Sequence, residues 1–179
     1  MRTIFCDHNS TTRTDPRVAA AMQEVAVEYF ANASSSHRLG QAARVRLDES
    51  RAKVASLLGA KPSEIVFTAG GSESDNLAIM GSLLSHEARG KHFVTVASEH
   101  PAVTATAGWA QKNGFEVTVL PVDREGRVGI DQFAASLRSD TQIASVMLAN
   151  NEVGTVYPSA EVARIARDRG VVFHTDAVQ

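Results

Sequence analysis

Cysteine is almost absent from this sequence of 179 residues, in which Cys6 is the only one. A single cysteine excludes an internal disulfide framework and fits a reducing compartment, so we expect a cytoplasmic protein. No apolar run approaches the roughly 18 residues that a membrane span needs. The N-terminus also lacks the hydrophobic region of a signal peptide. Membrane association is therefore not expected.

The sequence also lacks a large excess of charge of one sign and the residue spacings that are typical of metal sites. The net charge of −2 gives no reason to expect nucleic-acid binding. None of the six histidines forms a His-x-x-x-His spacing and there is no Cys-x-x-Cys, so we expect no metal site. Cys6 has no clear basic neighbour or helix N-terminus to activate its thiol, which favours an incidental thiol over a nucleophile.

The sequence does contain an alternation of helical and strand patterns. Strands are expected at residues 65–68, 92–97, 115–120, 143–149 and 171–173. Helices are expected at 16–29, 38–58, 72–84, 101–113 and 158–169, with a short helix capped by Asp131. Strands that alternate with helices of this length predict an α/β fold with a mainly parallel sheet and helices on both faces.

Polar residues follow several of the expected strands. Right-handed crossovers place the strand-to-helix loops at one edge of a parallel sheet. The loops at that edge would hold Gly71-Ser72, Glu99-His100, Asn150-Asn151 and Asp176. We therefore expect these four sets of groups, which are far apart in the sequence, to converge on one crevice.

The glycine-rich segment 68–74 lies between a strand and a helix. Backbone amides at such a helix start can bind an anion, and the Ser72 hydroxyl could donate to a phosphate. The alternative is plain capping, because Ser72 and Asp75 resemble a capping box with Asp in place of Glu. The segment matches neither a P-loop nor a dinucleotide-binding fingerprint.

Two further loops carry candidate side chains. His100 could stack on a flat heteroaromatic ring and transfer protons, or be an ordinary histidine at a helix start. Asn151 and its neighbour Asn150 could bind ring substituents or substrate, or simply form an asparagine turn.

Asp176 follows the apolar run 171–173, which reads as a buried strand with a carboxylate at its tip. An unpaired buried carboxylate is very costly, so Asp176 needs a partner. A protonated pyridine nitrogen is one, as in enzymes that use pyridoxal phosphate. The alternative for Asp176 and Gln179 is a polar strand terminus in a larger domain.

Taken together, these segments resemble the NifS/IscS-type cysteine desulfurases, pyridoxal phosphate enzymes of aminotransferase class V. Each matching stretch is weak alone, but the ordered set is specific and covers nearly the whole chain. The main stretches are residues 7–12, 15–18, 32–37, 64–68, 72–79, 99–100, 150–155 and 174–179.

The resemblance implies a role for each candidate residue. Gly71 and Ser72 would hold the phosphate of pyridoxal 5'-phosphate, at positions where the family usually has Ala-Thr. His100 would stack on the pyridine ring and act as the catalytic proton shuttle. Asn151 would contact cofactor and substrate, Asp176 would pair with the ring nitrogen, and Gln179 would hydrogen-bond the phenolic oxygen. Residues 1–14 would border the active site, and 15–179 would form the cofactor-binding large domain of the transferase fold.

The resemblance also implies a division of the enzyme. The family's Schiff-base lysine, persulfide-forming cysteine and substrate-binding arginine would lie beyond Gln179, so we expect an incomplete large domain that is inactive alone. With its C-terminal half it would act as a homodimer that takes sulfur from L-cysteine, leaves alanine, and passes a persulfide to an acceptor protein, for example in iron–sulfur cluster assembly. Open alternatives are another class V enzyme, such as a selenocysteine lyase or an aminotransferase, or a non-catalytic α/β fragment.

Overall fold

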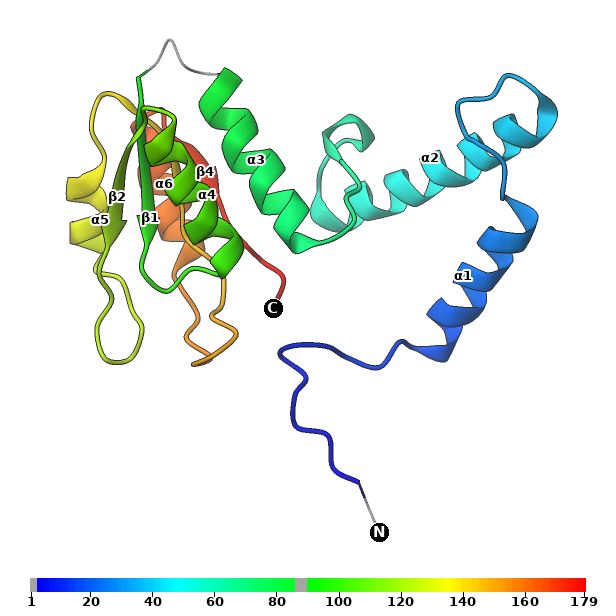
Figure 1. The fold of residues 1–179 in the computed structure, drawn as a ribbon, viewed down its shortest axis with the longest axis horizontal. Coiled ribbons are helices and arrows are strands. Elements are labelled where there is room, and N and C mark those ends of the chain that lie inside the picture. The colour runs from blue at the N-terminus through cyan, green and yellow to red at the C-terminus, as the bar shows by residue number, and fades with distance from the viewer. Residues whose placement is uncertain (1–2, 86–89) are drawn as a thin grey trace. The chain divides into compact units, whose positions relative to one another are not determined.

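The computed structural model describes residues 3–85 and 90–179. The chain divides into two compact units, with the boundary between Phe67 and Thr68 (Figure 1). The expected borders, at residues 14 and 15, remain a prediction.

The first unit is helical. It contains α1 (Pro16–Glu28), α2 (Arg38–Leu58) and the short 3-10 helix η1 (Pro62–Glu64). Asp15 caps α1 by accepting a hydrogen bond from the amide of Arg17 at 2.8 Å. Gly59 ends α2 in the left-handed region at φ +66°, where a residue without a Cβ is favoured.

The strand expected at residues 65–68 is wrong, because these residues form no strand. Ile65 has extended backbone angles, so the local preference is present. Val66 and Phe67 are nevertheless 68% and 47% exposed. A strand also requires a neighbouring backbone that completes its hydrogen bonds, and residues 65–68 pair with none of the described strands.

The second unit is built on a sheet of four described strands in the order β2-β1-β3-β4. The strands are β1 (His92–Val96), β2 (Glu116–Leu120), β3 (Thr141–Ser145) and β4 (Val172–His174), and every pair is parallel. The expected parallel α/β fold is therefore confirmed. β3 is shorter than the predicted 143–149, although the Val146 amide still donates to the His174 carbonyl at 3.1 Å.

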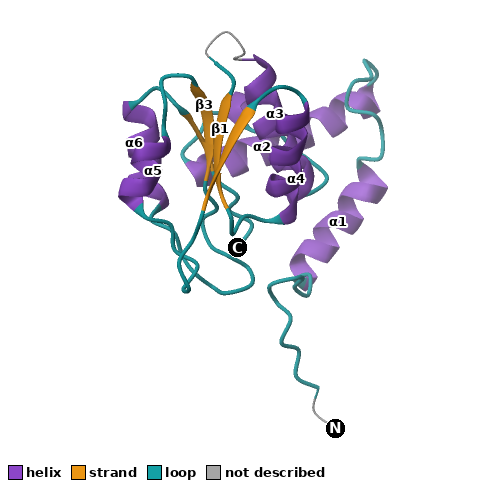
Figure 2. Cartoon of the chain, turned by 60° about the vertical axis from the view of Figure 1, so that its left-hand side comes forward, coloured by secondary structure: helices purple, strands orange, loops and turns teal. Residues whose placement is uncertain are grey.

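Helices cover both faces of this sheet (Figure 2). One face carries α3 (Gly71–Ser85) and α4 (Pro101–Lys112), and the other carries α5 (Ile130–Ser136) and α6 (Ser159–Asp168). Neighbouring residues of β1 point in opposite directions. Phe93 packs in the core between the sheet and helices α3 and α4, and Val94 packs in the core between the sheet and helices α5 and α6. Asp131 does not cap α5 as expected, because the helix begins one residue earlier and Gly129 is its N-cap. Among the described helices, none has the length and apolar character to cross a membrane.

Two valines of the sheet, one buried and one exposed, allow a matched test of the core. Val96 is fully buried in β1, whereas Val119 in β2 is 49% exposed. We expect Val96→Ala to lower the free energy of unfolding by about 2 kcal/mol, because it removes buried apolar surface and leaves a cavity. Val119→Ala should cost less than about 0.5 kcal/mol. Urea unfolding of both variants checks the difference, and equal losses would contradict the assigned core.

Candidate functional site

Three polar side chains meet at the carboxyl edge of the sheet. They are Asp75 of α3, His100 at the start of α4, and Asp176 after β4, and one nitrogen or oxygen atom from each lies within 4.8 Å of the others. Asp75 is 4% and Asp176 9% exposed. The structure therefore brings His100 and Asp176 together, as the sequence predicts, and adds Asp75.

Backbone pairing places Asp176 at this edge. The Leu148 amide donates to the Asp176 carbonyl at 2.8 Å, which continues the β3–β4 pairing beyond the strands themselves. The Asp176 carboxylate accepts a hydrogen bond from the Val178 amide at 3.0 Å. A carboxylate accepts more than one hydrogen bond, so this group also suits a further donor.

His100 is the N-cap of α4, and its Nδ1 accepts a hydrogen bond from the Ala102 amide at 3.1 Å. An accepting Nδ1 carries no hydrogen, so a neutral imidazole carries its hydrogen on Nε2. His100 thus has both of the roles weighed from the sequence: it begins a helix, and it belongs to the polar cluster.

Asp75 was not expected at the site, because its spacing from Ser72 suggested a capping group. In the structure α3 begins at Gly71, and it is Glu73 that accepts the Ala69 amide at 2.6 Å. The proposed capping box of Ser72 and Asp75 is therefore wrong. Asp75, Ile79 and Leu83 are the buried residues of α3 and are spaced four apart. This helical spacing is the sequence pattern that would have placed Asp75 on the buried face of the helix.

Two buried carboxyl groups lie close together in this cluster. Burial, and secondarily the nearby Asp176 carboxylate, raises the pKa of Asp75 to about 6, although His100 opposes the shift. Two neighbouring buried carboxyl groups are stabilised either by a proton or by a cation. The geometry would accept a protonated ring nitrogen or a small metal ion, so the predicted absence of a metal site remains a prediction.

A second group of polar side chains lies behind Asp75. His174 places Nε2 at 3.5 Å from Asp75 Oδ1 and Nδ1 at 2.9 Å from the Ser145 hydroxyl. Glu99 Oε1 accepts hydrogen bonds from the Met147 amide at 2.9 Å and the Ser145 hydroxyl at 3.3 Å. Burial raises the pKa of Glu99 to about 7, and its Oε2 has no partner among the described residues. Glu99 was expected at this edge of the sheet without a role of its own, and no role in the site was expected for Ser145 or His174.

The other candidate residues differ in their exposure. A Cβ added to Gly71 would lie 3.0 Å from Val178 Cγ2, so the start of α3 approaches the segment after β4 closely. Ser72 and Gln179 are exposed, and Asn151 is half-buried. Their expected contacts with a cofactor remain predictions.

Asn150 has a structural role in the loop after β3. Its Nδ2 donates to the Ser98 carbonyl at 2.8 Å, and its Oδ1 accepts from the amides of Glu152 and Val153. Asn150 therefore forms the asparagine turn that was one of the two interpretations of this loop.

Comparison with known proteins gives a consistent result. A family model described as aminotransferase class-V matches residues 4–179. The cysteine desulfurase IscS of Dictyoglomus turgidum is 44% identical over 99% of this chain, and that of Anaeromyxobacter sp. (strain K) is 48% identical over 98%. The chain spans 45% and 44% of the lengths of these two relatives.

Solved structures show the same likeness. A structure titled "NIFS-LIKE PROTEIN" superposes with a TM-score of 0.92 at 38% identity, over 97% of this chain and 48% of the other. A structure titled "SspA in complex with cysteine" gives a TM-score of 0.93 at 35% identity, over 99% of this chain and 51% of the other.

The buried Glu99 should make stability depend on pH. Its pKa is about 7 in the folded protein against 4.5 without the protein environment, so the stabilisation is present below pH 4.5 and lost as the pH rises to about 7. In Glu99→Gln this loss disappears. We expect the variant to gain on the order of 3 kcal/mol relative to the parent between those limits.

Urea unfolding at both ends of this pH range measures the gain. The exposed Glu125 of the turn before α5 provides the matched control, Glu125→Gln. A Glu99→Gln variant that keeps the pH slope of the parent would contradict the role of burial at this position.

Proposed function

This chain belongs to the aminotransferase class V family, and we propose that it is the N-terminal half of a cysteine desulfurase that uses pyridoxal 5'-phosphate. The reaction would remove sulfur from L-cysteine and give alanine and a protein persulfide. The observation that carries this proposal is the convergence of buried Asp176 with His100 at the carboxyl edge of the parallel sheet. The relatives named cysteine desulfurase favour this activity within the family.

The residues of the cluster fit the pyridine ring of the cofactor. Asp176 is buried beside a second carboxyl group, and a protonated ring nitrogen supplies the positive charge that such a pair lacks. His100 would lie against the ring. Its Nε2, the nitrogen not used for capping, would hold or move a proton near the substrate.

The start of α3 fits the phosphate group. The amides of its first residues have no carbonyl partner within the helix, and the helix dipole favours an anion there. Gly71 and Ser72 supply two of these amides, and Ser72 adds an exposed hydroxyl. Asn151 would contact cofactor and substrate, and Gln179 the phenolic oxygen.

The bound cofactor would act as an electron sink, and the remaining chemistry needs groups outside this chain. We propose that the lysine that anchors the cofactor, the cysteine that receives the sulfur and the arginine that binds the substrate carboxylate lie in the other half. The structural neighbour whose title names a complex with cysteine supports L-cysteine as substrate. Transfer of sulfur to an acceptor protein in the cytoplasm, as in iron–sulfur cluster assembly, belongs to the same proposal.

Asp176→Ala tests the pyridine assignment in the full-length protein. We expect it to keep part of its cofactor, because the phosphate contacts at Gly71 and Ser72 remain. It should lose about a thousandfold in turnover, because the ring nitrogen loses the anion that keeps it protonated. His100→Ala should lose about a hundredfold through impaired proton transfer. Alanine and sulfide production from L-cysteine measures both.

The control for this test is Asp168→Ala, which removes an exposed carboxylate from α6. It should turn over at the rate of the parent. Near-normal turnover in Asp176→Ala would remove the pyridine assignment.

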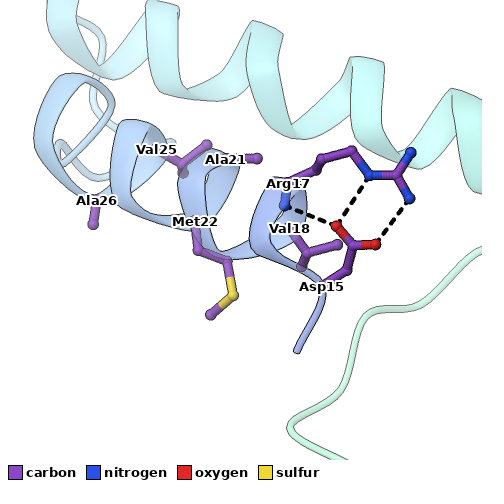
Figure 3. Close-up of a pocket in the computed structure, with 7 residues that line it drawn as sticks. All are labelled: Asp15, Arg17, Val18, Ala21, Met22, Val25 and Ala26. Atoms are coloured by element: carbon purple, nitrogen blue, oxygen red, sulfur yellow. Dashed lines mark hydrogen bonds and ion pairs between the residues drawn. The ribbon is translucent and has the colours of Figure 1, made fainter. Parts of the chain in front are cut away.

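We also propose that the protein is a homodimer. Helix α1 exposes Val18, Met22 and Val25 by 51%, 64% and 40% along one apolar strip (Figure 3). Exposed apolar strips of this kind mark association surfaces. We expect Val18→Ser with Met22→Ser to weaken self-association by about tenfold or more, as measured by sedimentation. Ala20→Ser is the control, and a parent that stays monomeric at high concentration would contradict the proposal.

A further inference from the structure

One buried tyrosine joins three loops at the carboxyl edge of the sheet. Tyr157 ends the loop after β3 and is 3% exposed. Its hydroxyl donates to the carbonyl of Gly126, in the turn after β2. The same hydroxyl lies 2.5 Å from the hydroxyl of Ser98, in the junction after β1. A single phenol group therefore holds together loops that follow three different strands.

The direction of these hydrogen bonds follows from the groups themselves. A carbonyl oxygen only accepts, so the one hydrogen of the Tyr157 hydroxyl lies toward Gly126 and the Ser98 hydroxyl donates to the Tyr157 oxygen. Burial raises the pKa of Tyr157, so the phenol keeps its hydrogen at neutral pH. Removal of the Tyr157 hydroxyl would take this partner from both neighbours.

Asn150 connects the junction after β1 to the loop after β3. It is 8% exposed, and its Nδ2 donates to the Ser98 carbonyl at 2.8 Å. Its Oδ1 accepts hydrogen bonds from the amides of Glu152 and Val153 at 2.8 and 2.9 Å. Ser98 is thus held at its hydroxyl by Tyr157 and at its carbonyl by Asn150.

Backbone hydrogen bonds within the loop after β3 fix its internal shape. The Asn150 amide donates to the Thr155 carbonyl at 2.9 Å, and the Gly154 amide donates back to the Asn150 carbonyl at 3.0 Å. The Tyr157 amide donates to the Leu148 carbonyl at 2.9 Å. The Tyr157 hydroxyl does not belong to this internal set, so its contacts act on where the loop lies against its neighbours.

We propose that Tyr157 is a positioning residue for Asn151. Asn151 lies between Asn150 and Glu152, and the contacts of the Asn150 side chain hold both of these residues. Through Asn150, the Tyr157 hydroxyl fixes the segment that carries Asn151 against the junction that leads to His100. The contact of Asn151 with cofactor and substrate rests on the proposed function.

Tyr157→Phe in the full-length protein removes the hydroxyl and keeps the ring. Titration of the cofactor-free protein should show an affinity for pyridoxal phosphate that is about fivefold lower, as the loss of one hydrogen bond gives. In the background of Asn151→Ala the same change should cost less than about twofold, because the residue through which Tyr157 acts is gone. Equal losses in both backgrounds would overturn the proposal, and so would an unchanged affinity in Tyr157→Phe alone.

Thr141→Val is the matched control. Thr141 also has a buried hydroxyl with two partners, the Arg138 amide and Nδ1 of His92, each at 2.8 Å. It begins β3, at the opposite edge of the sheet. Both variants should lose stability in urea, but Thr141→Val should change the affinity for pyridoxal phosphate by less than about twofold. An equal loss of affinity in the control would assign the effect to destabilisation and overturn the proposal.

Amide hydrogen exchange tests the positioning without any cofactor. In Tyr157→Phe the amides of Glu152 and Val153 should exchange about tenfold faster than in the parent, because the loop loses an anchor. In Thr141→Val their rates should stay within about twofold of the parent. Unchanged rates in Tyr157→Phe would contradict the proposal. A parent protein that binds no pyridoxal phosphate would instead refute the proposed function, while the exchange rates still decide the role of Tyr157.

Discussion

Hydrogen bonding between the residues that follow β3 and the C-terminal end of β4 with its next residues determines where the carboxylate of Asp176 lies. The amides of Val146 and Leu148 donate to the carbonyls of His174 and Asp176, so the pairing continues after the regular strands end. Because side chains alternate along an extended segment, His174 and Asp176 come to the same side. Asp75 and His100 then reach that side from two helices on one face of the sheet.

This arrangement brings buried acidic groups close together, so each carboxyl group needs a polar partner in place of water. Asp75, Glu99 and Asp176 are all less than a tenth exposed, and each carries a carboxyl group that water would otherwise solvate. Backbone amides donate hydrogen bonds to the carboxyl groups of Glu99 and Asp176. The imidazole of His174 lies beside the carboxyl group of Asp75. A positively charged ligand at this edge would offset the charge of these carboxyl groups.

The sequence predicted the features that depend on short-range pattern. Alternating helices and strands indicated the parallel sheet, and the residues after strands indicated its edge, including His100 and Asp176. It failed where pairing partners decide the outcome, as at 65–68, where the residues favour a strand that has no neighbour. It also failed at Ser145 and His174, because only the register of β3 with β4 brings these two residues together, and a single sequence does not reveal register. The burial of Asp75 could have been predicted, because Asp75, Ile79 and Leu83 follow the four-residue spacing of one helix face.

The order of the strands has a consequence for biosynthesis. β1, β2 and β3 precede β4 along the chain, and β4 adds to the open edge of β3. These three strands are synthesised before β4, so they can pair before Asp176 reaches the edge of the sheet. A ligand that binds this edge recognises only molecules in which β4 has docked, and by mass action it stabilises them. Binding at this edge therefore depends on the docking of β4, and it favours molecules in which the edge of β3 is covered.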